Sequence, residues 1–270
     1  MGILKETYNE NLALNFSTLK YLEISPLAYK HNLTHPKEQT TAMALGTAVH
    51  CCALQGPDIY SRRFPVWHGD RRGKEYTAFK ASRPDDAIIL KDTEDASVRA
   101  SAEAIHKKID VAEYDTEQPL YWSSNGVQLK SRLDGVAKTR KGMLELKCVS
   151  FAYMDPYKFS SHVLSMQWHA QLAMYHDAML FNGYDPLPVR LVVAEFTAPY
   201  DVVVYDVPQD VIDCGRKTYL RWIDVYNECA RANKWGAGRS VDNVTLRLPA
   251  YAYNNNDKLG LTIEGEEVDL

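Results

Sequence analysis

Two stretches in which apolar and polar residues alternate lie next to each other in the middle of the chain. Residues 127–137 alternate loosely, residues 143–149 alternate again, and residues 138–142 between them are basic and end in a glycine. Alternation of this kind is typical of β-strands, and a short polar segment with glycine is typical of a turn. The pattern predicts an antiparallel hairpin, in which pairing across the turn brings Asp134 alongside Glu145.

The remaining chain predicts helices and a few further strands around this hairpin. Apolar residues recur at helical spacing in residues 16–33, 38–55 and 92–110, and helices are also predicted at residues 164–181 and 211–232. Strands are predicted at residues 111–122, 188–196 and 202–207, loops over residues 56–90, and a connection at residues 150–165. In the first helix Ser17 is the predicted N-cap, and Ser25-Pro26 interrupts or restarts the helix.

These elements predict an α/β fold with a mixed central sheet flanked by helices. We expect a single domain over residues 1–235, with a helical N-terminal part (1–110) and a core (111–235) that carries the hairpin. Residues 236–270 are predicted to form a C-terminal extension. A chain of 270 residues is long enough to bury a substantial core in this way.

Composition narrows the class of protein. Hydrophobic residues make up 46% and charged residues 24% of the chain, as in ordinary globular proteins. No apolar run approaches the ~20 residues needed to span a bilayer, and the N-terminus lacks the apolar segment of a signal peptide. We therefore expect no membrane partner. Five cysteines form no disulfide framework or C-x-x-C pattern, so we expect a reduced cytoplasmic setting. With a net charge of −4, any contact with nucleic acid requires a local basic surface.

The hairpin places three charged side chains close together. Glu145 and Lys147 are two residues apart and share one face of their strand, whereas Leu144, Leu146 and Cys148 face the other side. With Asp134 nearby, the two carboxylates suit Mg²⁺ or Mn²⁺, and a neighbouring lysine can orient a water molecule or offset charge on a phosphoryl group. A solvated hairpin edge with a Glu–Lys pair explains the same spacing.

Asp134 followed by Glu145-Leu146-Lys147 resembles the D…(D/E)-x-K core of the PD-(D/E)xK nuclease superfamily, with Leu133 in place of its proline. Three other motifs occur in the matching order. The segment Gly46 to His50 resembles the G-x-x-x-H motif of RecB-like nucleases, and Gln171 to Tyr175 resembles their Q-x-x-x-Y motif. Trp168-His169-Ala170-Gln171 is similar to the aromatic-His-x-Gln form of RecE-type phage exonucleases. Residues 16–29 also resemble the first helix of those enzymes.

The resemblance spans roughly residues 15–210 and implies a fold and an activity. The fold is the restriction-endonuclease-like core, and the activity is that of a metal-dependent exonuclease of RecE or lambda type. Such an enzyme digests linear duplex DNA, 5′ to 3′ and processively, and leaves 3′ overhangs. The resemblance also implies a ring-shaped homo-oligomer, a single-strand annealing partner of RecT or beta type, and a phage or prophage origin in a bacterial host. Two alternatives stay open for the function. One is a structure-specific or restriction-type endonuclease, and the other is a catalytically idle DNA-binding or scaffold protein.

The resemblance assigns roles to individual residues. One or two Mg²⁺ ions, which Mn²⁺ can replace, are expected to be held by His50, Asp134, Glu145, the backbone carbonyl of Leu146 and the acidic residue ahead of the core, Glu117. Lys147 is expected to position or deprotonate the attacking water, Gln171 to orient that water or the phosphate, and Tyr175 to support the wall of the site.

Basic and polar residues outside this cluster are candidates for DNA binding. Ser17 and Lys20 lie on the first helix, which in the resembled family borders the active-site cleft, although a helix cap and a solvated lysine explain them as well. A second group occupies the loop-rich stretch and the first hairpin strand: Arg71, Arg72, Lys74 and Arg132. The loop arginines and lysine lie near Trp67 and Tyr76, so they are suited to a strand backbone or a base, or simply to solvent.

Overall fold

The predicted hairpin forms the centre of a five-stranded mixed sheet with the order β3-β4-β5-β6-β7. The computed structural model describes residues 8, 11–150, 154–236, 245–247, 261–263 and 266–268. The strands are β3 (Tyr114–Ser124), β4 (Val127–Ala137), β5 (Lys141–Val149), β6 (Asp185–Glu195) and β7 (Val202–Asp206). Neighbouring strands are antiparallel except for β5 and β6, which are parallel, so the predicted mixed α/β fold is confirmed.

The connections follow from local sequence. Asn125 and Gly126, at φ angles of 46° and 77°, form the tight turn between β3 and β4 that a two-residue hairpin loop requires. A parallel pair needs a longer crossover, and helices α8 (Pro156–Ser165) and α9 (Trp168–Phe181) lie between β5 and β6. The connection predicted at 150–165 is therefore partly helical, and the helix predicted from residue 164 begins instead at Trp168.

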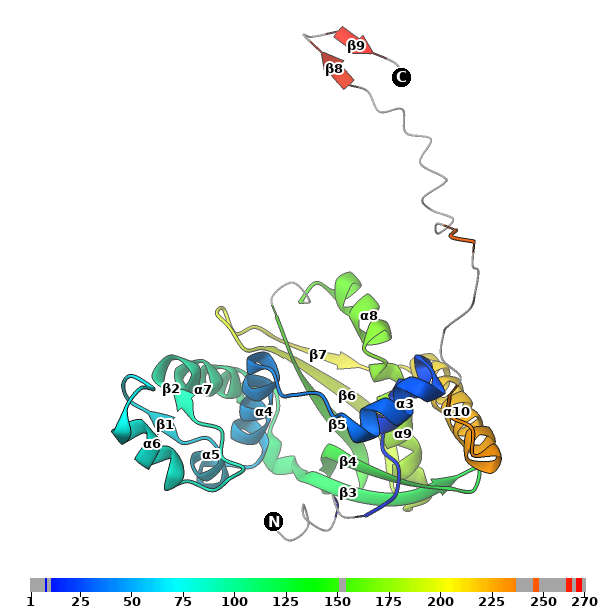
Figure 1. Cartoon of the computed structure of the whole chain (residues 1–270), viewed down its shortest axis with the longest axis horizontal. Coiled ribbons are helices and arrows are strands. Elements are labelled where there is room, and N and C mark those ends of the chain that lie inside the picture. Colours follow the sequence, from blue (N-terminus) through cyan, green and yellow to red (C-terminus); the bar gives the residue numbers. More distant parts are fainter. Residues whose placement is uncertain are drawn as a thin grey trace. The chain divides into compact units, whose positions relative to one another are not determined.

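Helices cover both faces of the sheet (Figure 1). On one face α9 and α10 (Gln209–Ala232) pack with the N-terminal helix α2 (Phe16–Leu19) around one cluster of buried residues. On the other face α4 (Thr41–Leu54) and α7 (Asp92–His106) pack around a second cluster, which includes Leu144, Leu146 and Cys148. This partition confirms the predicted alternation in β5 and leaves Glu145 and Lys147 on the face of α9.

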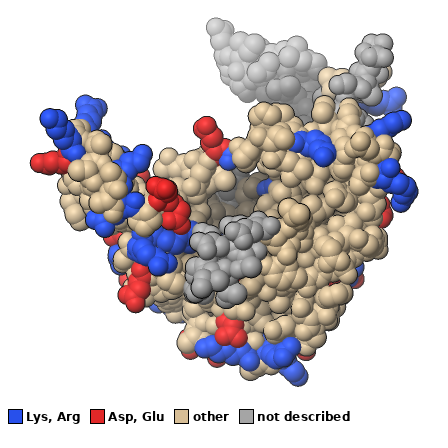
Figure 2. Space-filling view, turned by 60° about the horizontal axis from the view of Figure 1, so that its bottom comes forward, with Lys and Arg blue, Asp and Glu red and all other residues tan. Residues whose placement is uncertain are grey.

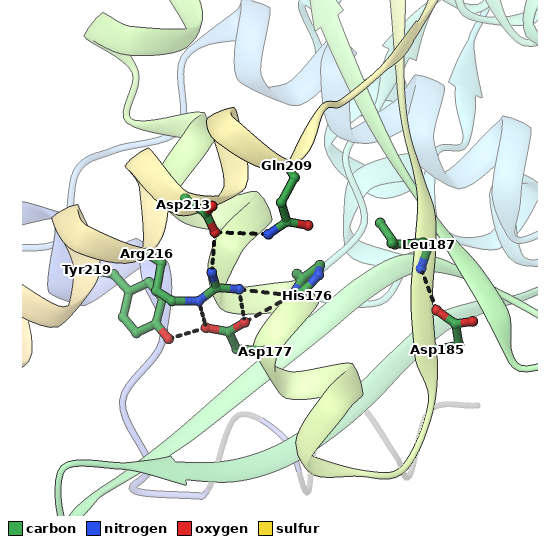
Figure 3. A network of polar contacts seen from close by, with 8 residues as sticks. All are labelled: His176, Asp177, Asp185, Leu187, Gln209, Asp213, Arg216 and Tyr219. Atoms are coloured by element: carbon green, nitrogen blue, oxygen red, sulfur yellow. Dashed lines mark hydrogen bonds and ion pairs between the residues drawn. The ribbon is translucent and has the colours of Figure 1, made fainter.

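Helices α9 and α10 lie against each other with little space between them. A Cβ atom added to Gly215 would lie 2.0 Å from the carbonyl oxygen of His169, so only glycine permits this approach. The contact also has a polar part, in which Arg216 of α10 holds both carboxylate oxygens of Asp177 of α9, at 2.8 and 2.6 Å (Figure 3). Tyr219 donates a further hydrogen bond to Asp177.

Residues 57–91, predicted as loop-rich, contain regular elements and are called here the 57–91 lobe. They comprise α5 (Pro57–Arg63), β1 (Val66–Trp67), α6 (Lys74–Ala81) and β2 (Leu90–Lys91), with β1 and β2 paired in parallel. The prediction failed here because α6 buries no residue completely and so shows no clear apolar period.

The helix predicted over residues 16–33 is divided into α2, the 3₁₀ helix η1 (Lys20–Glu23) and α3 (Pro26–Thr34). Asn15, rather than Ser17, caps α2, since its side chain accepts the backbone N–H of Thr18 at 3.0 Å. Ser25 caps α3 in the same way and Pro26 occupies its first position, so the predicted interruption is a restart.

The sequence separates into two units, 1–238 and 239–270. In the second unit β8 (Leu261–Ile263) pairs with β9 (Glu266–Val268), and most other residues of the predicted extension lie outside the described residues. In the first unit η2 (Val111–Glu113) precedes β3. Across the described residues, no helix combines the length and apolarity that a membrane crossing requires.

Candidate active site

The candidate site lies where β4 separates from β5. The two strands pair only at Gly135 with Leu144 and at Val136 with Met143. Beyond this point the backbone N–H of Leu146 is bound by the side chain of Asp134 instead of by a β4 carbonyl, at 2.8 Å from Oδ2. The separation thus directs the Asp134 carboxylate toward β5, next to Glu145, as the hairpin pattern predicted.

A chain of hydrogen bonds links β5 to α9. The ammonium of Lys147 donates to Oε1 of Glu145 at 2.5 Å and to Oε1 of Gln171 at 3.0 Å. The amide of Gln171 in turn donates to the hydroxyl of Tyr175 at 2.9 Å. Gln171 and Tyr175 are four residues apart and lie on one face of α9. Gln167, a further four residues before Gln171, has a left-handed conformation and lies ahead of the helix.

His50 approaches the site from the opposite face of the sheet. Its Nδ1 lies 3.6 Å from Oδ2 of Asp134. Gly46, one turn earlier on α4, faces β5, and the Sγ of Cys148 lies 3.9 Å from its carbonyl oxygen. A Cβ added to Gly46 would lie at an ordinary 3.7 Å from the Cβ of Cys148, so this contact does not itself require glycine.

Burial and mutual charge shape the protonation of the cluster. Burial and the charge of Asp134 raise the pKa of Glu145 to about 7, despite the opposing charge of Lys147. Burial alone would lower the pKa of His50 and raise that of Asp134, but their attraction dominates. The pKa of His50 therefore lies well above 6.5, and that of Asp134 lies below its ordinary value. Burial, followed by the two carboxylates, raises the pKa of Tyr175 and keeps its phenol neutral.

The donor set fits a hard divalent cation, as the motif resemblance implies. Two carboxylates and an imidazole converge here, and Oε2 of Glu145 is buried without a hydrogen-bond partner in a side chain that is 2% exposed. In the described part of the chain, however, no three His, Cys, Asp or Glu side chains are already arranged around a metal position. The residues that would hold a cation are Asp134, Glu145 and His50, while a role for the Leu146 carbonyl stays a prediction.

The cluster lies at the base of a cleft of about 1380 Å³. The cleft is lined by residues of α2, α4, β3, β4, β5 and α9, and by α5 of the 57–91 lobe. Figure 2 shows that the molecule is hollowed on one face. Trp168 also lines the cleft, and its ring centroid lies 5.2 Å from the Lys147 ammonium. Trp168 begins the aromatic-His-x-Gln motif but had no expected role in the site, although its position three residues before Gln171 indicates a shared face of the helix.

The structure brings several other predicted residues to the cleft. Glu117, Arg132 and Ser17 line it, and Oε2 of Glu117 lies 3.1 Å from Nε of Arg132. Lys20 lies beside the rings of Phe16 and Tyr21. Burial lowers the pKa of Lys20, and the charges of Lys37 and Lys147 lower it further. Lys20 is not among the described residues that line the cleft.

The three basic residues predicted in the loop-rich stretch have different surroundings. Arg71 donates to the carbonyl of Ile89 at 2.7 Å and to Glu94 at 3.2 Å, so it fastens the lobe to α7. Arg72 has a side chain that is 92% exposed, and Lys74 is exposed at the start of α6. The cleft also contains two arginines that the sequence analysis missed, Arg62 and Arg63.

Comparisons with known proteins agree with this geometry. A family model described as "PDDEXK-like domain of unknown function (DUF3799)" matches residues 15–240. A search of curated proteins gives no match. A solved structure from Eubacterium rectale, of a protein named as a candidate exonuclease, has a TM-score of 0.54 at 13% identity. The similarity covers 90% of this chain and 93% of that one, and it indicates the same fold.

A second solved structure, of a phage-related exonuclease from Haemophilus somnus, has a TM-score of 0.36 at 9% identity. It covers 84% of this chain and 100% of that one. That score is too low to support a structural argument. The family match therefore identifies the kind of domain, and the first neighbour supports the fold alone.

Proposed function

Since the chain belongs to the family of PDDEXK-like domains, we propose that it is a metal-dependent nuclease that hydrolyses phosphodiester bonds of DNA. One observation carries this proposal. Asp134, Glu145 and Lys147 meet beneath Gln171 at the base of a cleft, with one buried carboxylate oxygen unpartnered. A solvated hairpin edge, the alternative explanation of the same motif, would not bury Glu145 to 2% exposure.

A divalent cation held by Asp134, Glu145 and His50 would neutralise the approaching phosphate and lower the pKa of a bound water. We propose Mg²⁺ as that cation, with Mn²⁺ as a substitute, in one or two positions. The carboxylates alone would repel an anionic substrate. Glu145 with a pKa of about 7 gives up its proton readily near neutral pH, and it then provides the negative charge that a cation needs.

Lys147 is the residue that we expect to act on the water or on the scissile phosphate. Its ammonium is fixed from two sides by Glu145 and Gln171, and the Trp168 ring lies against it. Gln171 donates to Tyr175, and this bond turns its carbonyl oxygen toward Lys147. A lysine held in this way loses little conformational entropy when it stabilises the charge that develops on the phosphate.

We further propose an exonuclease that acts on the ends of linear duplex DNA, processively and 5′ to 3′, and leaves 3′ overhangs for strand annealing. The motif resemblance to RecE-type and lambda-type enzymes supports this narrower assignment, and the neighbour from Eubacterium rectale is named as a candidate exonuclease. The same resemblance supports a ring-shaped homo-oligomer, a single-strand annealing partner, and action in the cytoplasm of a bacterial host of a phage or prophage.

Digestion of linear and closed-circular duplex DNA tests the proposal. Each substrate is incubated with the wild type and Mg²⁺, with the wild type and EDTA, and with Lys147→Ala and Mg²⁺. Loss of the linear substrate alone, abolished by EDTA and by the substitution, is the expected result. Cutting of the circle would identify an endonuclease on the same core. No metal-dependent cutting of either substrate would leave a DNA-binding or scaffold protein.

A further inference from the structure

We infer that the 57–91 lobe is a backbone-binding arm, on which Arg62, Arg72 and Lys74 hold the sugar–phosphate backbone of the nucleic acid that extends beyond the catalytic cleft. This inference rests on the proposed nuclease function and assigns the basic surface that an acidic DNA-binding protein requires. The partner is defined by its chemistry, a regularly spaced polyanion, and sequence plays no part in its recognition.

Charge is distributed unevenly between the lobe and the rest of the protein. Residues 57–91 contain eight Lys and Arg against five Asp and Glu, a net charge of +3 in a chain whose net charge is −4. Lys and Arg side chains gather on this lobe beside the hollow (Figure 2). The protein therefore concentrates positive charge on one border of its catalytic cleft while the remainder carries −7.

The cations of the lobe divide into bound and available groups. Arg71 is committed to Ile89 and Glu94, and Arg83 lies 4.3 Å from the centroid of the Phe79 ring. Arg62, which lines the cleft, and Lys74 make no hydrogen bond or ion pair with another described residue. Arg72 has only a contact of 3.9 Å with Asp70, and both of these side chains are largely exposed. Arg62 thus lies at the cleft, whereas Arg72 and Lys74 are exposed to solvent on the lobe and are not among the described residues that line the cleft.

The base of the lobe is firm enough to hold these cations in place. Tyr60, Phe64 and Leu90 are buried in the cluster that they share with α4 and α7. The hydroxyl of Tyr60 also donates to Asp95 of α7 at 2.7 Å. Helix α6, by contrast, buries no residue completely, so its surface contributes little to the core and is free to serve a partner.

Binding measured against salt concentration tests the arm. The variant Arg62→Gln/Arg72→Gln/Lys74→Gln is compared with the wild type and with the control Lys217→Gln/Arg231→Gln/Lys234→Gln. The control removes the same charge from exposed residues of α10 and the segment after it. The dissociation constant of a labelled linear duplex is measured in EDTA from about 50 to 200 mM salt. Each lost phosphate contact should reduce the slope of log K against log salt by about 0.9.

The expected result is a slope lower by about 2 to 3 for the lobe variant and unchanged for the control. Equal Tm values for the wild type and both variants should show that the substitutions leave the fold intact. If the wild type cleaves duplex DNA and both variants have the same salt slope as the wild type, the proposed role of the lobe in binding DNA is wrong. An acidic protein then becomes the candidate partner for this surface. If the wild type neither binds nor cleaves, the proposed function fails and the arm fails with it.

Discussion

Glu117 lies directly across from Asp134 at the point where the pairing of β3 with β4 is interrupted. Thr116 pairs with Gly135 and Gln118 with Leu133, so the missing pair between them is Glu117 and Asp134. Glu117 has a φ of 54°, a left-handed conformation that is unfavourable for a residue with a Cβ. The backbone is therefore strained beside the carboxylate on which the candidate site depends.

Replacing Glu117 by glycine and by alanine should separate the backbone from the side chain. Both changes remove the carboxylate and its ion pair with Arg132, but only glycine adopts positive φ without cost. We expect Glu117→Gly to be about 1 kcal/mol more stable than Glu117→Ala in urea unfolding. At the neighbouring Gln118, whose φ is not positive, the order should reverse. Equal stability of the two Glu117 variants would mean that this conformation stores no strain.

Gly215→Ala should separate α9 from α10. The added methyl would lie 2.0 Å from the carbonyl oxygen of His169, and the clash can be relieved only by moving the backbone of one helix away from the other. Overpacking of this kind typically costs 1–3 kcal/mol, and we expect about 3 kcal/mol here. Cys214→Ala, at the exposed position before it, should change the unfolding free energy by less than about 0.5 kcal/mol. A stable Gly215→Ala variant would show that the helices can move apart cheaply.

Acid should weaken the same helix pair through Asp177. Burial would raise the pKa of this carboxyl, but its bonds to Arg216, His176 and Tyr219 lower the pKa well below the ordinary value (Figure 3). As the pH falls below about 4, the unfolded chain takes up a proton before the native state does, so stability is lost toward the depressed native pKa. At neutral pH the carboxyl of Asp177 is ionised in both states, so its full contribution to the free energy of unfolding is present.

The measurement is urea unfolding from about pH 7 to pH 3, where one such group contributes at most about 1.4 kcal/mol per pH unit. Asp177→Asn should cost about 2 kcal/mol at neutral pH and should flatten the acid part of the profile. Asp213→Asn serves as the control, since Asp213 binds the same arginine from an exposed position and should change the profile little. Parallel profiles for the wild type and Asp177→Asn would contradict the assignment.

The sequence was most informative where local patterns decide the structure. Period-two alternation predicted the hairpin and the opposite faces of Leu146 and Lys147, because side-chain direction in a strand follows from position alone. Gln171 and Tyr175 are four residues apart within a predicted helix, a spacing that gives two side chains a shared face. These local patterns place side chains on a shared face, whereas the expectation that His50, Gln171 and the hairpin belong to one site came from the motif resemblance.

Other features depend on contacts between distant segments or on unusual backbone. The left-handed conformations of Glu117 and Gln167 carry no sequence signal, because glycine is absent at both positions. Arg71 was indistinguishable from Arg72 in sequence, and only its contact with Glu94, 23 residues away, separates a structural arginine from an available one. The regular structure of the 57–91 lobe was hidden because α6 lacks a buried face.

Divalent cations should stabilise the protein through Glu145. A buried carboxylate with an unpartnered oxygen is unfavourable in the metal-free chain, and a ligand that binds only the folded state adds RT ln(1 + [L]/Kd) to its stability. At a concentration of Mg²⁺ or Mn²⁺ about 100 times Kd this amounts to about 2.7 kcal/mol, or a rise in Tm of roughly 5–10 °C for a domain of this size. Because the pKa of Glu145 is about 7, the cation displaces its proton, and the rise should grow as the pH increases across that value.

Glu145→Gln tests whether this residue is responsible. The variant keeps an acceptor for Lys147 but removes the charge, so it should fold in the absence of metal and lose most of the rise in Tm. Glu228→Gln, at an exposed position of α10, should retain the full rise. The titration is run at constant ionic strength with Na⁺ as the reference, so that general screening is separated from site binding. A full rise in Glu145→Gln would place the cation elsewhere, and the proposed ligand role of Glu145 would have to be withdrawn.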